Sequence, residues 1–552
     1  MIDHLVSGVN HEASGIPAMA GTTASNRFDL GRMRRLLAAL GDPHLAVRAV
    51  HVAGSKGKGS TASLLSACLS AAGHRVGLYT SPHLLALEER IAASAPGASN
   101  PRPRPIPPDD LAFLVRRHAP AIAQVARAEG PGALSHFEVV TALAFRYFAD
   151  LSVDVAVLET GLGGTTDATN VLPGGNLEAA VITALGLEHV EALGGSLASI
   201  AAAKAGILRP GRPLVLGPQT AHPEAEGMVA AEARRLGCPL VRAQDSVQVA
   251  SRGLRLEPSR TGQALRERLT ITLLPEDPSP SPSSSSLPAS PSTSVTSTSS
   301  ASASAPASSL EAEVGLVGPA QHANVATAVA AARVLRRGGW ALPDEALAAG
   351  LAAAALPGRF QVVKLKGGGG SSPEPWLLLD GAHTPESAAA LAAAAGAALP
   401  PAETHPRALV LAAAADKDHR GVAAALRALQ PRVVIFTQVP IAGSYARSAS
   451  AATLAAQWQA AAILAPPGSK ALRCRTLVAG SMDAALARAQ QELAALMVAT
   501  SGTAGAVGPG AEGGVGGGAE GWGERCGVLM VTGSLHAVAE VHRLPDFAPL
   551  LG

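Results

Sequence analysis

Short runs of apolar residues alternate with longer segments of helical spacing along most of the chain. The apolar runs predict buried strands at 49–53, 153–158, 180–185, 377–379, 409–412, 433–436 and 528–531. Ala- and Leu-rich segments between them, such as 60–72 and 388–398, predict helices. Strands that alternate with helices predict parallel sheets covered on both faces. We therefore expect an α/β fold with one domain at 27–330 and a second at 331–552, and leave 1–26 unassigned.

Three stretches of low complexity interrupt this alternation. Residues 278–309 are almost entirely Ser, Pro, Ala and Thr. Such a segment cannot bury enough apolar surface to offset its ordering entropy, so we predict a disordered insertion there. Residues 367–375 predict a flexible loop, and the Gly-rich residues 501–524 predict a loop ahead of the final strand.

Composition excludes several classes of protein. The 552 residues carry a formal net charge of +2, which gives no strongly basic face for nucleic acid. No apolar run reaches the roughly 20 residues of a membrane helix, so we expect a soluble protein without a membrane partner. We also expect the protein to be a monomer. The four cysteines form no CxxC pair, which argues against a zinc site or a disulfide framework. The first 26 residues contain acids and no Arg, so no targeting peptide is clear, and we expect the cytoplasm or the mitochondrion.

The strongest local signal is the loop GSKGKGS, which follows an apolar run and opens a predicted helix. Its glycines let backbone N–H groups approach an anion, and the helix N-terminus and a lysine add positive charge. The spacing differs from GxxxxGK[ST] because a glycine separates the lysine from the serine. A Gly-rich turn with incidental lysines is the alternative, but the setting favours phosphate binding. The predicted ATP-binding residues of the loop are Gly54, Gly57, Lys58, Gly59 and Ser60.

Polar side chains follow predicted strands near this loop. Glu159 ends an apolar run and enters the turn ETGLGG, His189 follows the next predicted strand, and Ser81 lies in a turn after LYT. Open α/β folds place ligands at this edge of the sheet. Oxygen and imidazole ligands beside a phosphate loop suit Mg²⁺. Each residue also has a structural explanation: a strand-end acid, a core histidine and a helix cap.

The loop GSKGKGS resembles the GTxGKGS loop of the dihydrofolate synthase and folylpolyglutamate synthase branch of the Mur ligase superfamily. The resemblance continues in order along nearly the whole chain. It covers YTSPHL, ERI, SHFEVVTALAF, VLETGLGGTTDATNV, ITALGLEHVEALGGSLASIAAAKAGILRPGRP, GPAQHAN, PGR, LDGAHTPES, DKDH and VTGSLH. The resemblance implies a P-loop, Mur-ligase-like central domain and a second, Rossmann-like C-terminal α/β domain.

The resemblance also implies a reaction. ATP would phosphorylate a substrate carboxylate, and the amine of L-glutamate would displace phosphate from the acyl phosphate. Lys58, Lys204 and His189 would be the catalytic residues, and Ser81, Glu159 and His189 would hold Mg²⁺. Lys204 would be carbamylated and help to hold a second Mg²⁺ ion, although Ala203 stands where relatives often have an acid.

The second half would complete the ATP site. By resemblance, Asn324 contacts the adenine side and Arg359 reaches the terminal phosphate, while Asp380 and His383 follow a predicted strand in LDGAH. An arginine from another domain suits a transition state whose charge gathers on the γ-phosphoryl oxygens. A surface arginine after a Pro-Gly turn is the structural alternative.

For a pterin substrate, Phe137 could stack on the flat ring and Glu138 could accept its N–H groups, with Asp167 as a further candidate. Core packing explains Phe137 equally well, and the basic residue that many relatives carry near Thr165 is absent. SHFEVVTALAF and VTGSLH resemble plant-type dihydrofolate synthases, so we favour dihydropteroate as the acceptor. A folylpolyglutamate synthase or a bifunctional enzyme is the alternative, and a P-loop ATPase without ligase activity is an alternative of another class.

Overall fold

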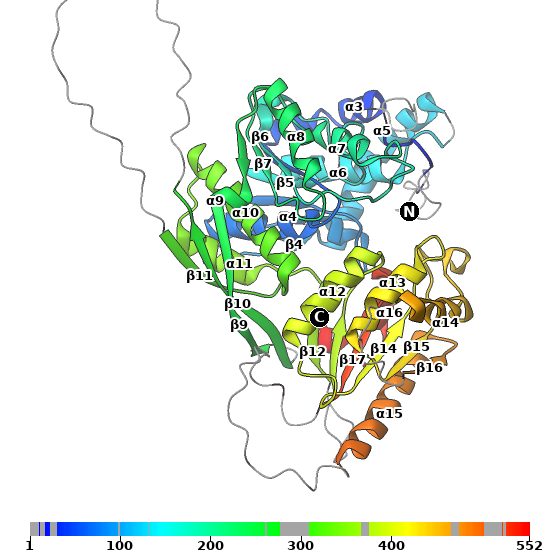
Figure 1. Ribbon diagram of the computed structural model, residues 1–552. Helices are drawn as coiled ribbons and strands as arrows, with labels where there is room; N and C mark the ends of the chain where they lie inside the picture. The colour runs from blue at the N-terminus through cyan, green and yellow to red at the C-terminus, as the bar shows by residue number, and fades with distance from the viewer. Residues whose placement is uncertain are drawn as a thin grey trace, which may run out of the picture.

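The computed structural model describes residues 10, 17–22, 30–97, 100–130, 132–259, 262–275, 308–365, 375–464, 474–501, 522 and 526–551. Most of each predicted low-complexity stretch (278–309, 367–375 and 501–524) lies outside these residues. Ser308 and Ser309, which we predicted as the end of the insertion, instead begin a strand. The described residues form two sheets with helices around them (Figure 1).

The first sheet has eight strands within the described residues, in the order β4-β3-β2-β5-β1-β6-β7-β8. They are β1 (Ala49–Ala53), β2 (Val76–Tyr79), β3 (Ile91–Ala93), β4 (Arg104–Pro105), β5 (Val155–Glu159), β6 (Leu177–Ile182), β7 (Leu214–Leu216) and β8 (Leu240–Arg242). Strand β1 lies at the centre and pairs in parallel with β5 and β6. All of its residues are buried, which is why this strand reads as an unbroken apolar run rather than an alternating one.

Helices cover both faces of this sheet, and alternate residues of β1 face different cores. Val50 and Val52 belong to the same core as α4 (Lys58–Ala71), α10 (Pro319–Arg337) and α11 (Asp344–Ala353). Ala49 and Ala53 belong to the core that includes α3 (Leu30–Ala39), α5 (Pro108–Glu129) and α6 (His136–Asp150). Two further helices, α7 (Leu197–Ala205) and α8 (Glu224–Arg235), pack against each other.

The second sheet follows the order β11-β10-β12-β13-β17-β14-β15-β16, with β9 beside β10. Its strands are β9 (Val247–Ser259), β10 (Gly262–Leu273), β11 (Ser308–Val314), β12 (Gln361–Lys364), β13 (Trp376–Leu379), β14 (Arg407–Leu411), β15 (Val433–Phe436), β16 (Arg475–Val478) and β17 (Val528–Thr532). Strands β13, β17, β14, β15 and β16 run parallel. The helices of this half include α12 (Pro385–Ala398), α13 (His419–Leu426), α14 (Ala451–Ala460), α15 (Met482–Ser501) and α16 (Leu535–Arg543).

The ribbon β9–β11 connects the two halves. It pairs with the second sheet through β10 and β12, yet Leu269, Ile271 and Val314 lie in the core that holds α4 and α10. Figure 1 shows the ribbon running along one side of the molecule from the first half to the second. The predicted domain boundary at residue 330 stays a prediction. The packing of α10 and α11 on α4 favours a division after α11.

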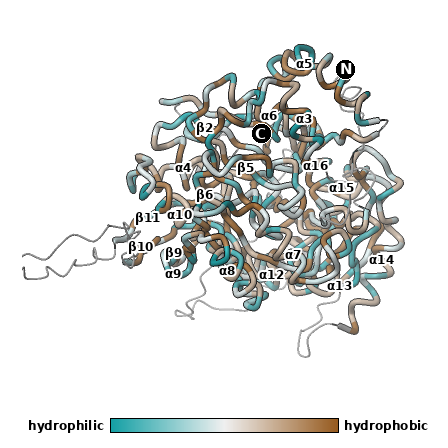
Figure 2. Tube along the Cα trace, turned by 90° about the horizontal axis from the view of Figure 1, so that it is seen from above, coloured by the Kyte–Doolittle hydropathy of each residue, from teal (hydrophilic) through white to brown (hydrophobic). Residues whose placement is uncertain are grey.

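Apolar, brown stretches alternate with polar, teal stretches along the trace in Figure 2, and many of the teal stretches lie at the periphery. No helix in the described part of the chain is both long and apolar enough to cross a membrane.

Candidate active site

The loop between β1 and α4 has the geometry of a phosphate loop. Gly57 is the N-cap of α4 with φ of 86°, a backbone conformation that favours glycine. A Cβ atom at Gly57 would also lie 2.1 Å from Oδ1 of Asn324, so a larger residue does not fit there. Lys58 begins α4, and its Nζ donates to the carbonyl of Ser55 at 3.3 Å. The helix N-terminus and a lysine therefore share one loop, as predicted.

Glu159 lies directly beside this loop. It ends β5 and is 5% exposed, and its Oε2 accepts a hydrogen bond from the backbone N–H of Ser81 at 3.1 Å. A Cβ atom at Gly59 would lie 3.4 Å from the same oxygen. Burial raises the pKa of Glu159, while the charges of Lys58 and Arg359 act against that rise. The structure thus brings Ser81, Glu159 and the loop together.

His189 lies in the loop after β6 with a left-handed φ of 52°. Burial lowers its pKa to about 4, and the charges of Lys58, Lys204 and Lys417 add to this effect. The imidazole is therefore neutral at neutral pH and keeps a lone pair for a metal ion. Among the described residues, no three His, Cys, Asp or Glu side chains cluster as metal ligands. The predicted ligands of Mg²⁺ are Ser81, Glu159 and His189, which include only two residues of those four types.

Lys204 lies on α7 and is 4% exposed. Its Nζ donates to the carbonyl of Gly54 at 2.7 Å, so α7 supports the phosphate loop directly. Burial and the charge of Lys58 lower the pKa of Lys204 to about 7. A substantial fraction of this amine is therefore neutral near pH 7.

The second half contributes charged groups to the same cleft. Arg359 is half-buried and makes no hydrogen bond or ion pair with any residue that the structure describes. Its charge acts on both Glu159 and Asp380. The Asp380 carboxylate accepts the N–H groups of Phe360 and Ala382, each at 2.8 Å. Asp380 therefore shapes the turn that positions Arg359.

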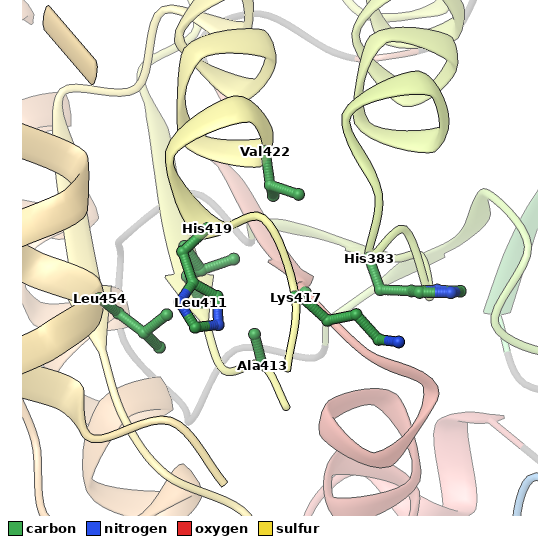
Figure 3. Close-up of a pocket in the computed structure, with 8 residues that line it drawn as sticks. His383, Leu411, Ala413, Lys417, His419, Val422 and Leu454 are labelled. Atoms are coloured by element: carbon green, nitrogen blue, oxygen red, sulfur yellow. The ribbon is translucent and has the colours of Figure 1, made fainter. Parts of the chain in front are cut away.

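A small pocket adjoins this turn, at the carboxyl ends of β14 and β17 (Figure 3). It is lined by His383, Leu411, Ala413, Lys417, His419, Val422, Leu454 and Gly533. The side chains of His383 and Lys417 extend in the same direction in Figure 3. Nδ1 of His383 lies 3.1 Å from the carbonyl of Gly381, which fixes the ring orientation. The charge of Lys417 also contributes to the lowered pKa of His189, which belongs to the first half.

Phe137 is near the site, at the start of α6. Its ring centroid lies 5.9 Å from that of Tyr79. A Cβ atom at Gly161, two residues after Glu159, would lie 2.6 Å from the Phe137 ring. The half-buried ring therefore covers the turn that follows β5, and its role as a substrate platform stays a prediction.

Glu138 is fully engaged within the protein. Its Oε2 accepts the N–H and Oγ–H of Ser135, at 2.8 Å and 2.6 Å, which caps α6. Its Oε1 accepts from Nε of Arg32 at 2.7 Å, and both side chains are buried. This geometry does not favour the predicted contact between Glu138 and a substrate.

Asp167 is engaged in the same way. Its Oδ1 accepts from the N–H and the hydroxyl of Thr169, and its Oδ2 accepts from the N–H of Leu162. These bonds close the turn after Glu159. Asp167 therefore orders the backbone beside the site, and its predicted contact with a substrate stays a prediction.

Sequence reasoning did not single out Lys56, Glu188 or Thr384. Nζ of Lys56 forms an ion pair with Glu188 and donates to Oγ1 of Thr384 at 3.2 Å. Lys56 was visible as the other lysine of GSKGKGS, but only the folded chain shows that it reaches the second domain.

A larger groove, of about 810 Å³, lies at the opposite edge of the first sheet. It is lined by Arg48, Gly175, Asn176, Glu178, Arg212, Pro213, Pro239, Val334, Leu335, Arg337 and Gly338. None of the predicted site residues lines this groove, so its size does not make it the candidate active site.

Comparisons with known proteins define the class of this chain. Residues 358–502 match the family described as Mur ligase, glutamate ligase domain. The chain is 32% identical over 365 residues to the dihydrofolate synthase/folylpolyglutamate synthase of Bacillus subtilis, an alignment that covers 66% of this chain and 71% of that protein. It is 31% identical over 417 residues to the folylpolyglutamate synthase of Lacticaseibacillus casei, which covers 75% and 82%.

A solved structure agrees. Folylpolyglutamate synthase of Mycobacterium tuberculosis, complexed with ADP and AMPPCP, is similar with a TM-score of 0.66, at 26% identity over 98% of both chains. This chain is therefore an ATP-using ligase of the Mur class that forms a carbon–nitrogen bond. It belongs to the dihydrofolate synthase/folylpolyglutamate synthase family. The predicted fold class and reaction class are confirmed.

Proposed function

We propose that this ligase joins L-glutamate to 7,8-dihydropteroate and so produces dihydrofolate. The observation that supports a pterin-bearing acceptor is the Phe137 ring, which lies over Gly161 beside Glu159. An aromatic face at this point offers a stacking surface for a flat pterin next to the phosphate loop. The choice of dihydropteroate over a folate, which also carries a pterin, rests on the resemblance of SHFEVVTALAF, at the start of α6, to plant-type dihydrofolate synthases.

The phosphate loop and Arg359 are proposed to bind ATP. Backbone N–H groups of residues 54–60 and the Lys58 ammonium would hold the phosphates. Arg359 would stabilise charge on the γ-phosphoryl group as it is transferred. What supports this role is its half-buried guanidinium, which has no ion-pair partner among the described residues. Asn324, in contact with the loop at Gly57, would lie beside the bound nucleotide.

Ser81, Glu159 and His189 are proposed to hold Mg²⁺. A buried carboxylate and a neutral imidazole suit a divalent cation, and burial of Glu159 without such a cation is electrostatically costly. Lys204, as a carbamate, would add an anionic oxygen for a second ion. Bound Mg²⁺ would offset the negative charge of the ATP phosphates.

The ligation would proceed in two steps. The carboxylate of dihydropteroate attacks the γ-phosphorus, which gives an acyl phosphate and releases ADP. The amine of L-glutamate then attacks the acyl carbonyl, and phosphate leaves. The pocket of His383 and Lys417 has a volume of about 10 Å³, which holds about one water molecule, so L-glutamate is not placed in it. His383 is proposed, with Asp380, to lie beside the bound nucleotide.

Folylpolyglutamate synthesis is the second candidate, and relatives carry both names. The two activities differ in the place of the acceptor carboxylate. In dihydropteroate it is attached to the benzoyl ring, and in a folate it is the γ-carboxyl of an added glutamate, several atoms further out. One rigid pterin pocket cannot present both carboxylates at the same point without a shift of the ring, so an enzyme with both activities would have to move the pterin. Family membership sets aside the ATPase without ligase activity.

The test is glutamate incorporation by the purified enzyme with ATP, Mg²⁺ and labelled L-glutamate, with either dihydropteroate or tetrahydrofolate at saturation. We expect dihydropteroate to be used faster, since a misplacement of about 1 Å costs on the order of a hundredfold in rate. Phe137→Leu is expected to raise KM for the pterin acceptor, whereas Phe113→Leu, at an exposed position on α5, leaves it unchanged. Faster ligation onto tetrahydrofolate would assign the chain to polyglutamylation.

A further inference from the structure

Lys56 is held rigidly by its backbone. Its N–H donates to the carbonyl of Ala184 at 3.1 Å, and its carbonyl accepts from Oγ1 of Thr183 at 2.7 Å. Both partners lie just after β6 in the first domain. The point from which the Lys56 side chain leaves the phosphate loop is therefore fixed on two sides.

The side chain of Lys56 crosses to the second domain. Its Nζ donates to Oγ1 of Thr384 at 3.2 Å and forms an ion pair with Oε1 of Glu188. Thr384 is the N-cap of α12, where its Oγ1 also accepts from the N–H of Ser387. One lysine thus connects the phosphate loop, the loop before His189 and the first turn of a second-domain helix.

Glu188 makes this contact electrostatically acceptable. The N-terminus of a helix carries partial positive charge, so a lone ammonium at the cap of α12 would be repelled. The Glu188 carboxylate, 18% exposed in its side chain, neutralises Lys56, which is 36% exposed. Lys56, Glu188 and Thr384 therefore form one group of contacts across the domains.

The place of this contact connects it to the reaction. Thr384 directly follows His383, on the second-domain turn that is assigned with Asp380 to the nucleotide. Lys56 lies two residues before Lys58, on the loop assigned to the phosphates. Phosphoryl transfer requires groups from both domains to lie at fixed positions around the phosphates, so the loop and this turn must keep a fixed separation.

We propose that Lys56, with Glu188 and Thr384, is an interdomain latch that positions the turn of Asp380 and His383 against the phosphate loop. Lys56 is a positioning residue in this arrangement rather than a contact of ATP. The proposal rests on the ligase activity of the site, whichever folate is the acceptor. It predicts that loss of the latch slows ligation while nucleotide binding is retained.

The test is a double-mutant cycle of Lys56→Met and Thr384→Val. Thr384→Val also removes the cap of α12, but it does so with and without Lys56 alike, so the cycle isolates the contact between Lys56 and Thr384. We expect each single variant to lower kcat about tenfold and the double variant to be no slower than either. The Kd for a non-hydrolysable ATP analogue is expected to stay within about twofold of the wild type. Thr384→Ser, which keeps the hydroxyl, and Lys56→Arg, which keeps the charge, should restore most of kcat.

Lys364→Met, which removes a lysine from β12 outside the latch, serves as the matched control and should leave kcat unchanged. Weaker nucleotide binding in Lys56→Met at an unchanged kcat would make Lys56 a phosphate contact and overturn the latch. Additive losses in the double variant, or no loss in either single variant, would overturn it as well. If Lys56→Met does not fold, the comparison of Thr384→Val with Thr384→Ser at matched melting temperature decides the same point.

Failure of the proposed function has a different signature. It would appear as no glutamate incorporation by the wild-type enzyme with dihydropteroate. The latch is then measured with whichever acceptor the wild type does use.

Discussion

The sharpest prediction concerns Glu138, for which sequence and structure point to different roles. The substitution Glu138→Gln keeps the size of the side chain and an oxygen that can still accept from Ser135. It removes the charge that faces Arg32, and it turns an amide N–H₂ group toward the guanidinium or the cap. Stability is therefore expected to fall, because the buried Arg32 loses its carboxylate partner.

The expected loss follows from burial. The side chains of Arg32 and Glu138 are only 8% and 6% exposed, so solvent screens their interaction little. Removing one partner of a buried pair costs about 3–5 kcal/mol. We expect the lower end, about 3 kcal/mol, because glutamine can still cap α6. In a domain of this size that loss corresponds to a fall in melting temperature on the order of 6 °C.

Thermal unfolding followed by circular dichroism measures this loss, with KM for the pterin acceptor determined in parallel. Glu232→Gln is the matched control, since Glu232 pairs with Arg235 at 2.6 Å but both side chains are much more exposed. Its expected cost is under about 1 kcal/mol. Arg32→Met combined with Glu138→Gln should recover much of the stability. A melting temperature within 1 °C of the wild type, together with a raised KM, would refute the structural role and restore the substrate role.

Three further predictions concern the loop, the insertion and Lys204. Lys58→Ala should abolish ligation and weaken binding of an ATP analogue in calorimetry, and normal turnover in a folded variant would contradict the phosphate-loop assignment. Replacing 278–307 by Asn-Gly should leave activity and melting temperature nearly unchanged. Leu273 and Ser308 are cross-strand partners, so a short connection can join them, and the entropy of loop closure grows slowly with loop length. A melting temperature lower by several degrees would contradict this. The pKa of Lys204 is lowered to about 7, so the fraction of its nucleophilic neutral form increases as the pH rises through 7. We therefore expect kcat to rise over that range and to respond to added bicarbonate. A flat pH profile of kcat, with and without bicarbonate, would exclude carbamylation.

The strands that the sequence predicted are those buried on both faces. The runs at 49–53, 433–436 and 528–531 appear as β1, β15 and β17 with at most one residue of difference. The ribbon β9–β11 was not predicted. Its strands contain charged residues among the apolar ones: Arg255 and Glu257 in β9, Glu311 and Glu313 in β11, and the run Arg266–Arg268 in β10. A search for unbroken apolar runs cannot find strands of that kind.

Some residues of the candidate site could also be predicted from the sequence, and others could not. Lys58, Glu159, His189 and Lys204 could be predicted because each follows or supports a strand end in a recognisable segment. The structural engagement of Glu138 was also visible in principle, because Ser135 and Glu138 have the spacing of a capping box. Its partner Arg32 lies 106 positions away, and the Lys56–Thr384 contact spans 328 positions. Neither can be inferred from local pattern.

The ribbon also determines how far the two halves can be treated as independent modules. Strand β12 borders β13 on one side and, at Ala264 and Val363, β10 on the other. A fragment that begins after α11 would lack β10 and expose that edge of β12, and an unpaired edge invites strand exchange between molecules. The complementary fragment would keep the ribbon but lose its pairing partner in the second sheet. Expressed separately, the C-terminal half should tend to self-associate, and mixing the two fragments should suppress that tendency.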